Sequence, residues 1–338
     1  INGLVASSTR GNSSIKPERT TELEMGSDFS MMNGFATVEA TYYVQNIEDL
    51  ILLVDEAPSS GASYSWQNGG EMETKGLELA LGLNPARLVE LGGLDWNLQF
   101  TYYSNESKVT KLNVDPYNFG GFATFLGTYR IEEGWSPSTI IGSDMWYVDS
   151  LSGQKTTDAS GVNPSDTSEY TNDPFLVDGV HQHKILGNEN PDYRLSIRNS
   201  FKFGPLSLSF LIDHKQGGHA INLANLIYDL GATTADYEEN GSRMAVLGGG
   251  STGPYVESTT YTALRDLSLT YSLGNVGDRF GVSDLQVGLA LRNWWMKSDY
   301  TGLSPEVSQF GNEAVGGSVD TNPFPLSKSV YLTLSMGF

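Results

Sequence analysis

One stretch of the chain has the G-x-S-x-G spacing that places a nucleophilic serine on a sharp turn in hydrolases. It reads G-G-S-T-G at Gly249–Gly253. Such a serine needs a buried strand before it, a helix after it and a histidine as base. Pro254 and Tyr255 follow instead, and no histidine lies downstream. We therefore interpret the stretch as a glycine-rich loop and predict no catalytic residue and no enzyme activity.

Two histidines and several loop carboxylates are of the types that bind metal ions. His181 and His183 lie on one face of an extended segment, near Asp173 and Asp178. Two histidines in a polar loop are more often solvated than metal-bound. The other acidic loop residues are Asp166, Glu169, Asp236, Glu238 and Glu239. Their spacing is not that of an EF-hand, so we predict no metal site and no cofactor.

Three basic residues share one side of a predicted strand. Arg194, Arg198 and Lys202 have the parity of small serines, opposite apolar residues such as Leu195 and Ile197. In a membrane barrel they form a basic stripe in the lumen, because on the lipid side each would cost about 2–4 kcal/mol at the midplane. We expect the stripe to pair with carboxylates, Asp213 among them, or to contact substrate.

The elements that must position these residues are alternating strands. The last twelve residues read S-K-S-V-Y-L-T-L-S-M-G-F, with an apolar side ending in Leu334, Met336 and Phe338 and a small, polar other side. Similar alternation recurs along the chain, and we also predict weaker strands near Thr20–Met31, Gly120–Ile131 and Thr139–Val148. The total is about eleven strands, each near the 9–11 residues that cross a bilayer. A terminal strand ending in phenylalanine resembles the assembly signal of outer-membrane β-barrels.

The connections between these strands alternate between short and long. The short ones are 31–34, 84–93, 132–138, 203–205 and 274–283. The long ones are 55–70, 104–119, 149–188, 217–258 and 297–326. Outer-membrane barrels have short periplasmic turns and long extracellular loops. The pattern therefore predicts an all-β transmembrane antiparallel barrel whose long loops lie outside the cell, with Ile221–Leu230 forming a short helix in one of them.

Composition narrows the class of protein. The 338 residues include no cysteine, 38 glycines and 17 tyrosines, and the net charge is −20. The acidic balance argues against nucleic acid as a partner. Aromatic pairs end several strands, and we expect one ring of each pair to face lipid in an interfacial girdle. The other ring faces the lumen or joins the girdle; these residues are Tyr43, Tyr103 and Trp294.

Seven short motifs resemble one family when taken in order. They are I-K-P-E-R-T-T-E-L-E-M-G at Ile15–Gly26, N-G-G-E-M-E-T-K-G-L-E-L at Asn68–Leu79, R-I-E-E-G-W at Arg130–Trp135, L-G-N-E-N-P-D-Y at Leu186–Tyr193, Y-T-A-L-R-D-L-S-L-T-Y at Tyr261–Tyr271, G-L-S-P-E-V at Gly302–Val307 and D-T-N-P-F-P-L-S-K-S at Asp320–Ser329. Together they resemble the barrels of SusC/RagA-type TonB-dependent outer-membrane receptors.

The resemblance implies a fold, a location and partners. Family members have a plug domain, a TonB box and a barrel of about 22 strands. We expect residues 1–338 to be the C-terminal part of such a barrel, without plug or TonB box and with both terminal strands as free edges. The family implies energised uptake of an oligosaccharide or peptide through the outer membrane of a Gram-negative bacterium. It also implies a SusD-like surface lipoprotein, the TonB complex and outer-membrane lipids as partners, and plug carboxylates as further contacts of the basic stripe.

An alternative from a different class stays open at this point. A soluble or surface-attached all-β module could use the long loops to bind a glycan or a protein partner. Membrane fractionation separates the two hypotheses, because a barrel requires detergent for extraction.

Overall fold

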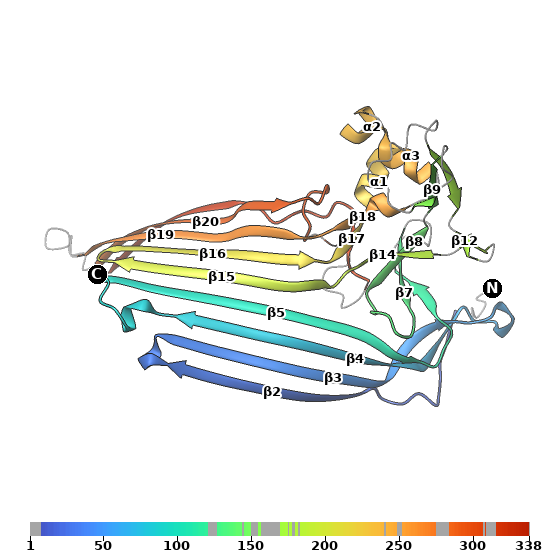
Figure 1. Ribbon diagram of the computed structural model, residues 1–338, viewed down its shortest axis with the longest axis horizontal. Coiled ribbons are helices and arrows are strands. Elements are labelled where there is room, and N and C mark those ends of the chain that lie inside the picture. The colour runs from blue at the N-terminus through green and yellow to red at the C-terminus, as the bar shows by residue number, and fades with distance from the viewer. Residues whose placement is uncertain are drawn as a thin grey trace, which may run out of the picture.

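The computed structural model describes residues 8–120, 127–143, 145–149, 155–156, 170–174, 176–177, 180–181, 183–239, 241–248, 252–274, 284–306, 308 and 316–337. Nine long strands form one antiparallel sheet, in which spatial order follows chain order (Figure 1). They are β2 (Arg19–Met31), β3 (Ala36–Asp55), β4 (Tyr64–Leu83), β5 (Leu94–Leu112), β15 (Pro191–Phe203), β16 (Leu206–Gly217), β19 (Tyr261–Gly274), β20 (Asp284–Ser298) and β22 (Ser329–Gly337). A short strand, β1 (Thr9–Arg10), pairs with β4 in parallel.

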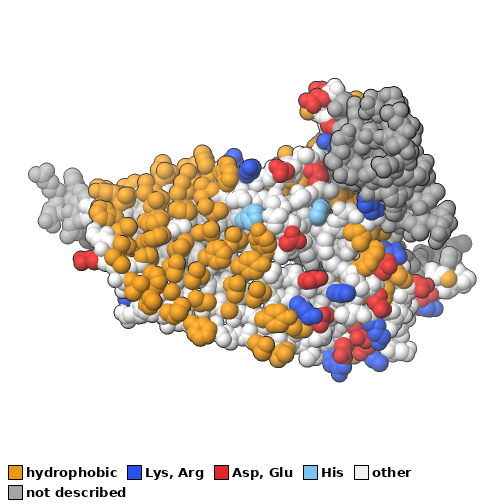
Figure 2. Space-filling model, in the orientation of Figure 1, with side chains coloured by type: hydrophobic (Ala, Val, Ile, Leu, Met, Phe, Trp, Pro, Cys, Tyr) orange, Lys and Arg blue, Asp and Glu red, His pale blue; other side chains and the backbone are white. Residues whose placement is uncertain are grey.

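The two faces of this sheet have opposite character. On β22 the alternating apolar residues point outward, and Leu332 is 83% exposed. The next residue, Thr333, pairs with Gly288 of β20 and lies on the inner face. Figure 2 shows a broad hydrophobic area over the long strands. Charged side chains gather toward the end of the sheet that lies opposite the C-terminus. An apolar outer face with a continuous ladder behind it is the arrangement that lipid requires.

The ends of the strands differ as the connection lengths predict. The short turns lie at the end of the sheet that holds the C-terminus, whereas the helices and small sheets gather at the opposite end (Figure 1). This separation confirms the predicted fold class, in which the short-turn end is periplasmic and the elaborated end is extracellular. Among the described residues, no helix is long and apolar enough to cross a membrane.

Two of the predicted membrane strands were wrong. The segments predicted at Gly120–Ile131 and Thr139–Val148 contribute β7 (Thr128–Ile131), β8 (Thr139–Ser143) and β9 (Met145–Asp149) to small extracellular sheets. The described barrel strands therefore number nine and not about eleven. Tyr129 and Ile140 are fully buried against other protein side chains. An apolar run has the same composition whether it faces lipid or a protein core, so the pattern alone misassigned these segments.

The predicted turn at 132–138 and the predicted lengths of two strands were also wrong. Residues 132–138 are not a periplasmic turn, because the backbone N–H of Gly134 donates to Val109 at the extracellular end of β5. Strands β3 and β4 have 20 residues each, about twice the length predicted, and the loop between them shrinks to 56–63. At about 3.4 Å per residue, strands of this length extend beyond the hydrocarbon core. Their outer ends form a wall above the membrane.

The described strands leave the sheet open. Strand β2 is paired only with β3, and β22 only with β20, so these two strands are its edges, as predicted. Strands and helices from the connections 113–190, 218–260 and 299–328 pack over the extracellular end, and we call them the cap. Its elements include a sheet of β6 (Tyr117–Phe119), β7, β8 and β14 (His183–Asn188), and a sheet of β17 (His219–Asn222), β18 (Val256–Ser258) and β21 (Val319–Asp320).

The other described strands and the α-helices also belong to the cap. They are β9 with β10 (Lys155–Thr156) and β11 (Tyr170–Pro174), the pair β12 (Leu176–Val177) and β13 (Val180–His181), and the helices α1 (Leu223–Leu230), α2 (Ala235–Glu239) and α3 (Ser242–Gly248). Helix α1 confirms the helix predicted at Ile221–Leu230. It begins where the Asn222 side chain accepts a hydrogen bond from the backbone N–H of Asn225. That cap satisfies one of the donors left free at a helix start.

Adjacent residues of β22 test the two faces. We expect Leu332→Arg to reduce folding of the full-length protein into lipid vesicles by about 2–4 kcal/mol if the site lies near the midplane. Thr333→Arg faces the lumen and should be far milder. The heat-modifiable folded band on gels measures both variants. Equal losses would contradict the assignment of faces.

Sidedness can be tested with inserted protease sites. A site placed after Thr233, in the connection between α1 and α2, should be cut on intact cells carrying the full-length protein. A site placed after Gly204, in the turn between β15 and β16, should be cut only after the outer membrane is permeabilised. Cleavage of the second site alone on intact cells would invert the orientation.

Candidate functional site

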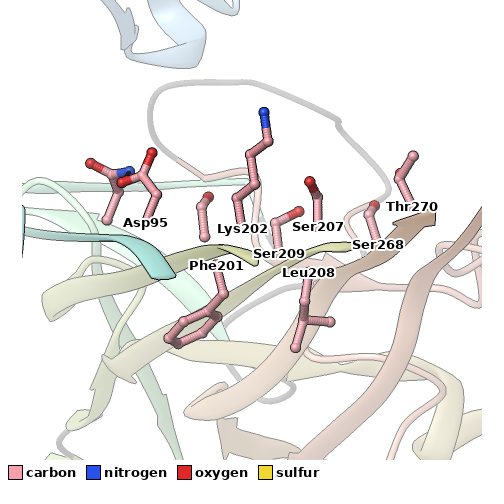
Figure 3. Close-up of a pocket in the computed structure, with 10 residues that line it drawn as sticks. Asp95, Phe201, Lys202, Ser207, Leu208, Ser209, Ser268 and Thr270 are labelled. Atoms are coloured by element: carbon pink, nitrogen blue, oxygen red, sulfur yellow. Dashed lines mark hydrogen bonds between the residues drawn. The ribbon is translucent and has the colours of Figure 1, made fainter. Parts of the chain in front are cut away.

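The inner face of the sheet is the candidate site, because alternation collects its polar side chains there. Figure 3 shows Phe201 and Leu208 pointing to one side of the sheet, and Lys202 and Ser207 pointing to the other. A hollow of about 200 Å³ lies at this place, near the periplasmic end. Its hydroxyl-bearing lining residues are Ser200, Ser207, Ser209, Ser268 and Thr270. Such a wall offers small hydrogen-bonding groups to whatever fills the lumen.

The predicted basic stripe lies on this face. Arg194, Arg198 and Lys202 are exposed, and they alternate with the outward residues of β15. Lys202 is in register with Asp95 of β5, which lines the same hollow. Within the described part of the chain, no ion pair is formed by the three basic residues. Their role as a contact for a plug or a substrate therefore stays a prediction.

Asp213 does not pair with the stripe, contrary to our expectation. Its carboxylate accepts hydrogen bonds from the Arg265 guanidinium, at 3.0 and 3.1 Å, and from the Tyr261 hydroxyl at 2.9 Å. Arg265 also binds Glu306 from the cap, with its Nη1 2.8 Å from Oε2. The ladder between β16 and β19 shifts so that Arg265 is an extra residue, and this shift places its side chain beside Asp213. The guanidinium thus joins the wall to the cap.

A neighbouring lysine, Lys215, binds the cap segment that contains Glu306. The side chain of Lys215 is buried at the extracellular end of β16, and its Nζ lies 2.8 Å from the Thr259 hydroxyl. It also donates to the carbonyl of Pro305 at 3.5 Å and lies over the Tyr261 ring. Lys215 and Arg265 therefore hold residues 305–306 against the inner wall from two adjacent strands.

A second hollow, of about 470 Å³, lies on the inner face of β2–β5. Glu22, Glu24 and Glu78 line it together with the Tyr43 ring, and no lysine or arginine is among its nine lining residues. The ring of Tyr43 lies over Gly76, where even a Cβ atom would be 2.2 Å from the ring. Glycine at this position allows the aromatic ring to lie flat on the wall. We call this feature the acidic hollow.

Of the other aromatic residues predicted for the lumen or the girdle, one can be assigned to a face of the sheet and one cannot. Tyr103 is in register with Glu78 and Arg194, so it lies on the inner face together with Tyr43. Trp295 pairs with outward Leu264, but Trp294 falls within the register shift opposite Arg265. Trp294 is 45% exposed, and its choice between lumen and girdle stays a prediction. In the predicted assembly signal, Leu334 and Met336 are exposed on the outer face, whereas Phe338 is outside the described residues.

The cap has its own hydrophobic core above the wall. Its fully buried side chains include Tyr129, Ile140, Ile221, Tyr255 and Val319, which come from all three long connections. Tyr129 also accepts a hydrogen bond at its hydroxyl from the backbone N–H of Ser318. Burial raises the pKa of this tyrosine. Three connections that are distant in sequence therefore fold as one unit.

A buried carboxylate organises the helices of the cap. Asp229 of α1 has no exposed side-chain surface, and both of its oxygens lie 2.8 Å from the Arg243 guanidinium of α3. It also accepts hydrogen bonds from the hydroxyls of Thr234 and Tyr255. Burial acts to raise the pKa of Asp229, but these hydrogen bonds outweigh it, and the pKa lies below its usual value. Motif spacing does not reveal this cluster, since its members lie 5 to 26 positions apart and match no motif.

Comparison with known proteins decides the family. Residues 2–293 match the family described as TonB dependent receptor-like, beta-barrel. This chain belongs to the TonB-dependent receptor-like β-barrel family. Curated relatives of this receptor barrel include TonB-dependent receptor P26 of Formosa agariphila, which is 24% identical over 97% of the chain and 35% of the relative. TonB-dependent receptor SusC of Bacteroides thetaiotaomicron is 21% identical over 97% of the chain and 32% of the relative.

Solved structures share the fold of this receptor barrel. The RagAB peptide importer in its "open-open" state has a TM-score of 0.70 at 20% identity, covering 99% of this chain and 36% of that one. The RagAB peptide transporter has a TM-score of 0.67 at 20% identity and covers 93% of this chain and 34% of that one. The receptor barrel thus spans about a third of the length of the curated relatives it matches.

Other chemical candidates have different outcomes in the receptor barrel. Gly249–Ser251 of the glycine-rich stretch, and Asp166, Glu169 and Asp178, lie outside the described residues, as do the side chains of Asp173, His181 and His183. Asp236 and Glu238 lie in the first turn of α2. Among the described side chains, no group of three or more His, Asp or Glu residues could hold a metal ion.

Removal of the Arg243 side chain should loosen the cap. Arg243→Leu leaves the carboxylate of Asp229 buried without its cation, which costs about 3–5 kcal/mol in comparable pairs. We expect proteinase K to cut residues 223–256 faster in this variant of the full-length receptor. Lys111→Leu is the matched control, because it breaks an exposed pair with Glu71 and should cost at most about 1 kcal/mol.

The same cluster predicts a pH dependence. The pKa of Asp229 is lower in the folded state than its ordinary value of 3.8. The ionised carboxylate therefore stabilises the cap at pH values above 3.8. That stabilisation should be lost as the pH falls from 3.8 through the folded-state pKa, and protease resistance of the cap should fall with it. Arg243→Leu should flatten this dependence. Identical acid profiles for the variant and the wild type would contradict it.

Proposed function

We propose that this chain is the C-terminal barrel portion of a receptor that imports an oligosaccharide or peptide across the outer membrane of a Gram-negative bacterium. On this proposal the plug and the TonB box belong to another part of the receptor, and TonB in the inner membrane supplies the force through them. A SusD-like lipoprotein covers the extracellular mouth. Residues 1–338 contribute wall, loops and cap, and transport involves no covalent step and no cofactor.

The observation that carries the proposal is the combination of an apolar outer face, a polar inner face and a folded cap at one end. Leu332 and its outward neighbours belong against acyl chains, and serines, threonines and charged residues line the opposite face. The likeness of the fold to the RagAB peptide importer and the relationship to SusC support import by the same class of machine. Identity of the cargo does not follow from these relationships, so both cargo classes stay in the proposal.

The inner wall has a defined part in this function. Arg194, Arg198 and Lys202 are available to carboxylates of a plug or to acidic groups on the cargo. Tyr43 and Tyr103 present aromatic surface on the same face, onto which sugar or side-chain rings can stack. Lys215 and Arg265 are already engaged with the cap. We therefore assign the basic stripe to contacts in the lumen and the other two cations to positioning the cap.

The soluble binding module is disfavoured by the outer face. Large apolar side chains are exposed on many strands, and they form a broad hydrophobic area in Figure 2. Soluble monomers rarely expose contiguous apolar patches larger than a few hundred Å². No observation in the described part of the chain favours the module over the barrel.

Uptake by cells tests the proposal. A strain that lacks the full-length receptor should lose accumulation of a fluorescent oligosaccharide or peptide pool, and the restored gene should recover it. Dissipating the proton gradient with a protonophore should abolish the recovered uptake, because TonB-linked transport is energised from the inner membrane. Uptake that persists with the protonophore would indicate a passive pore. Recovery of the receptor in the soluble fraction would favour the binding module.

A further inference from the structure

An apolar pocket lies at the extracellular end of the inner face of the sheet, next to the acidic hollow and farther from the membrane. Its walls come from β3, β4 and β5 on one side and from the cap on the other. The lining side chains that matter here are Leu50, Leu52, Met72, Val109, Phe119 and Ile131. Its volume is about 250 Å³. An apolar cavity of about 150 Å³ stays dry and accommodates benzene, so this pocket has room for an aromatic or large aliphatic side chain.

The pocket offers few polar partners. The backbone groups of its walls are engaged in ladders, in which Met72 pairs with Ile47 and Val109, and Phe119 pairs with Tyr129. The N–H of Val109 donates to the carbonyl of Trp135, and its carbonyl accepts from Gly134, both at 2.8 Å. A hydroxyl that is buried without a hydrogen-bonding partner is destabilising in proteins. The pocket therefore disfavours a sugar ring and favours a hydrocarbon group.

The acidic hollow continues the pocket toward the membrane. Thr74 and Ser107 line the hollow, and Met72 and Val109 are two residues farther along the same strands. Two residues along a strand span about 7 Å. Of the hollow's carboxylates, Glu22 accepts a hydrogen bond from Gln45, and no ion pair within the described chain neutralises Glu22, Glu24 or Glu78. The near edge of the hollow, at Thr74 and Ser107, thus lies about 7 Å from the pocket on one inner face. Of the carboxylates, Glu22 lies at this level, because it is in register with Thr74 through Gln45 of β3.

We propose that the pocket and the acidic hollow together bind a peptide segment with a bulky apolar side chain and a basic side chain two positions apart. In an extended peptide, residues i and i+2 point to the same side, about 7 Å apart. The apolar side chain fills the pocket, and the ammonium or guanidinium group enters the acidic hollow. This inference rests on the proposed import function and selects peptide over oligosaccharide as the cargo class.

Binding of designed peptides to the detergent-purified full-length receptor tests this inference. The probe is acetyl-Ala-Phe-Ala-Lys-Ala-amide, measured by titration calorimetry. Replacing its phenylalanine with alanine should weaken binding about tenfold or more, since burying a side chain of this size stabilises by about 1.5–3 kcal/mol. Replacing its lysine with glutamate should abolish binding. A peptide with Phe and Lys adjacent, on opposite sides of the strand, should bind like the alanine peptide.

Receptor variants assign the two subsites. Met72→Trp fills the pocket and should remove the preference for phenylalanine over alanine. Leu79→Trp, on the outer face of the same strand, should leave that preference intact. Glu22→Gln should weaken binding of the lysine peptide several-fold, whereas Glu39→Gln, which is on the inner face but outside the hollow's lining, should not. Heat-modifiable migration on gels checks that each variant is folded.

Several outcomes would overturn the inference. Equal affinity for the phenylalanine and alanine peptides, or an unchanged preference in folded Met72→Trp, would show that the pocket is only a packing gap. Binding of an oligosaccharide pool with no binding of the probe would reject the peptide assignment while leaving import intact. Loss of import itself is read from the protonophore experiment, so the two failures are distinguishable.

Discussion

The absence of hydrogen-bonding partners in lipid is the constraint on which the structure depends. Each backbone N–H and C=O within the bilayer must find a partner in a neighbouring strand. The resulting ladder fixes an alternation of two, which sends Leu332 outward and Thr333 inward. It also demands close approach inside the wall, where Tyr43 lies over Gly76. The chain is released from this constraint only beyond the membrane, and there the helices and short strands of the cap appear.

Several motifs that carry the family resemblance contain residues that connect distant segments of the chain. Lys16 and Asn68, from the first two motifs, exchange hydrogen bonds of 2.8 and 2.9 Å between backbone and side chain. Arg265 in the Y-T-A-L-R-D motif binds Glu306 in the G-L-S-P-E-V motif. The carboxylate of Asp320, in the last motif, accepts from the hydroxyl of Tyr300 at 2.7 Å. Residues of these motifs therefore tie together segments that are distant in sequence.

Short-range patterns were enough to predict most of the wall but, apart from helix α1, not the cap. The ladder positions of β2 and β22, the inner face of Arg198 and the helix at Leu223–Leu230 all follow from short-range periodicity. The same reasoning wrongly placed the segments of Tyr129 and Ile140 in the membrane, because a protein core and a bilayer are equally apolar. The partner of Asp213 depends on a register shift at Arg265, which no spacing in the sequence announces. The pocket above the acidic hollow likewise exists only once three strands are in register with the cap.

The shared core of the cap has an evolutionary consequence. Tyr129, Leu226 and Val319 come from three different connections and bury one another's side chains. A recombination event that transplants one connection from a diverged paralogue would bring in only one part of an interior, shaped for foreign neighbours. Surface variation in these receptors should therefore spread by co-inheritance of all three segments, or by changes restricted to positions that the interior does not contact. Surface variation and structural integrity are coupled in such an architecture.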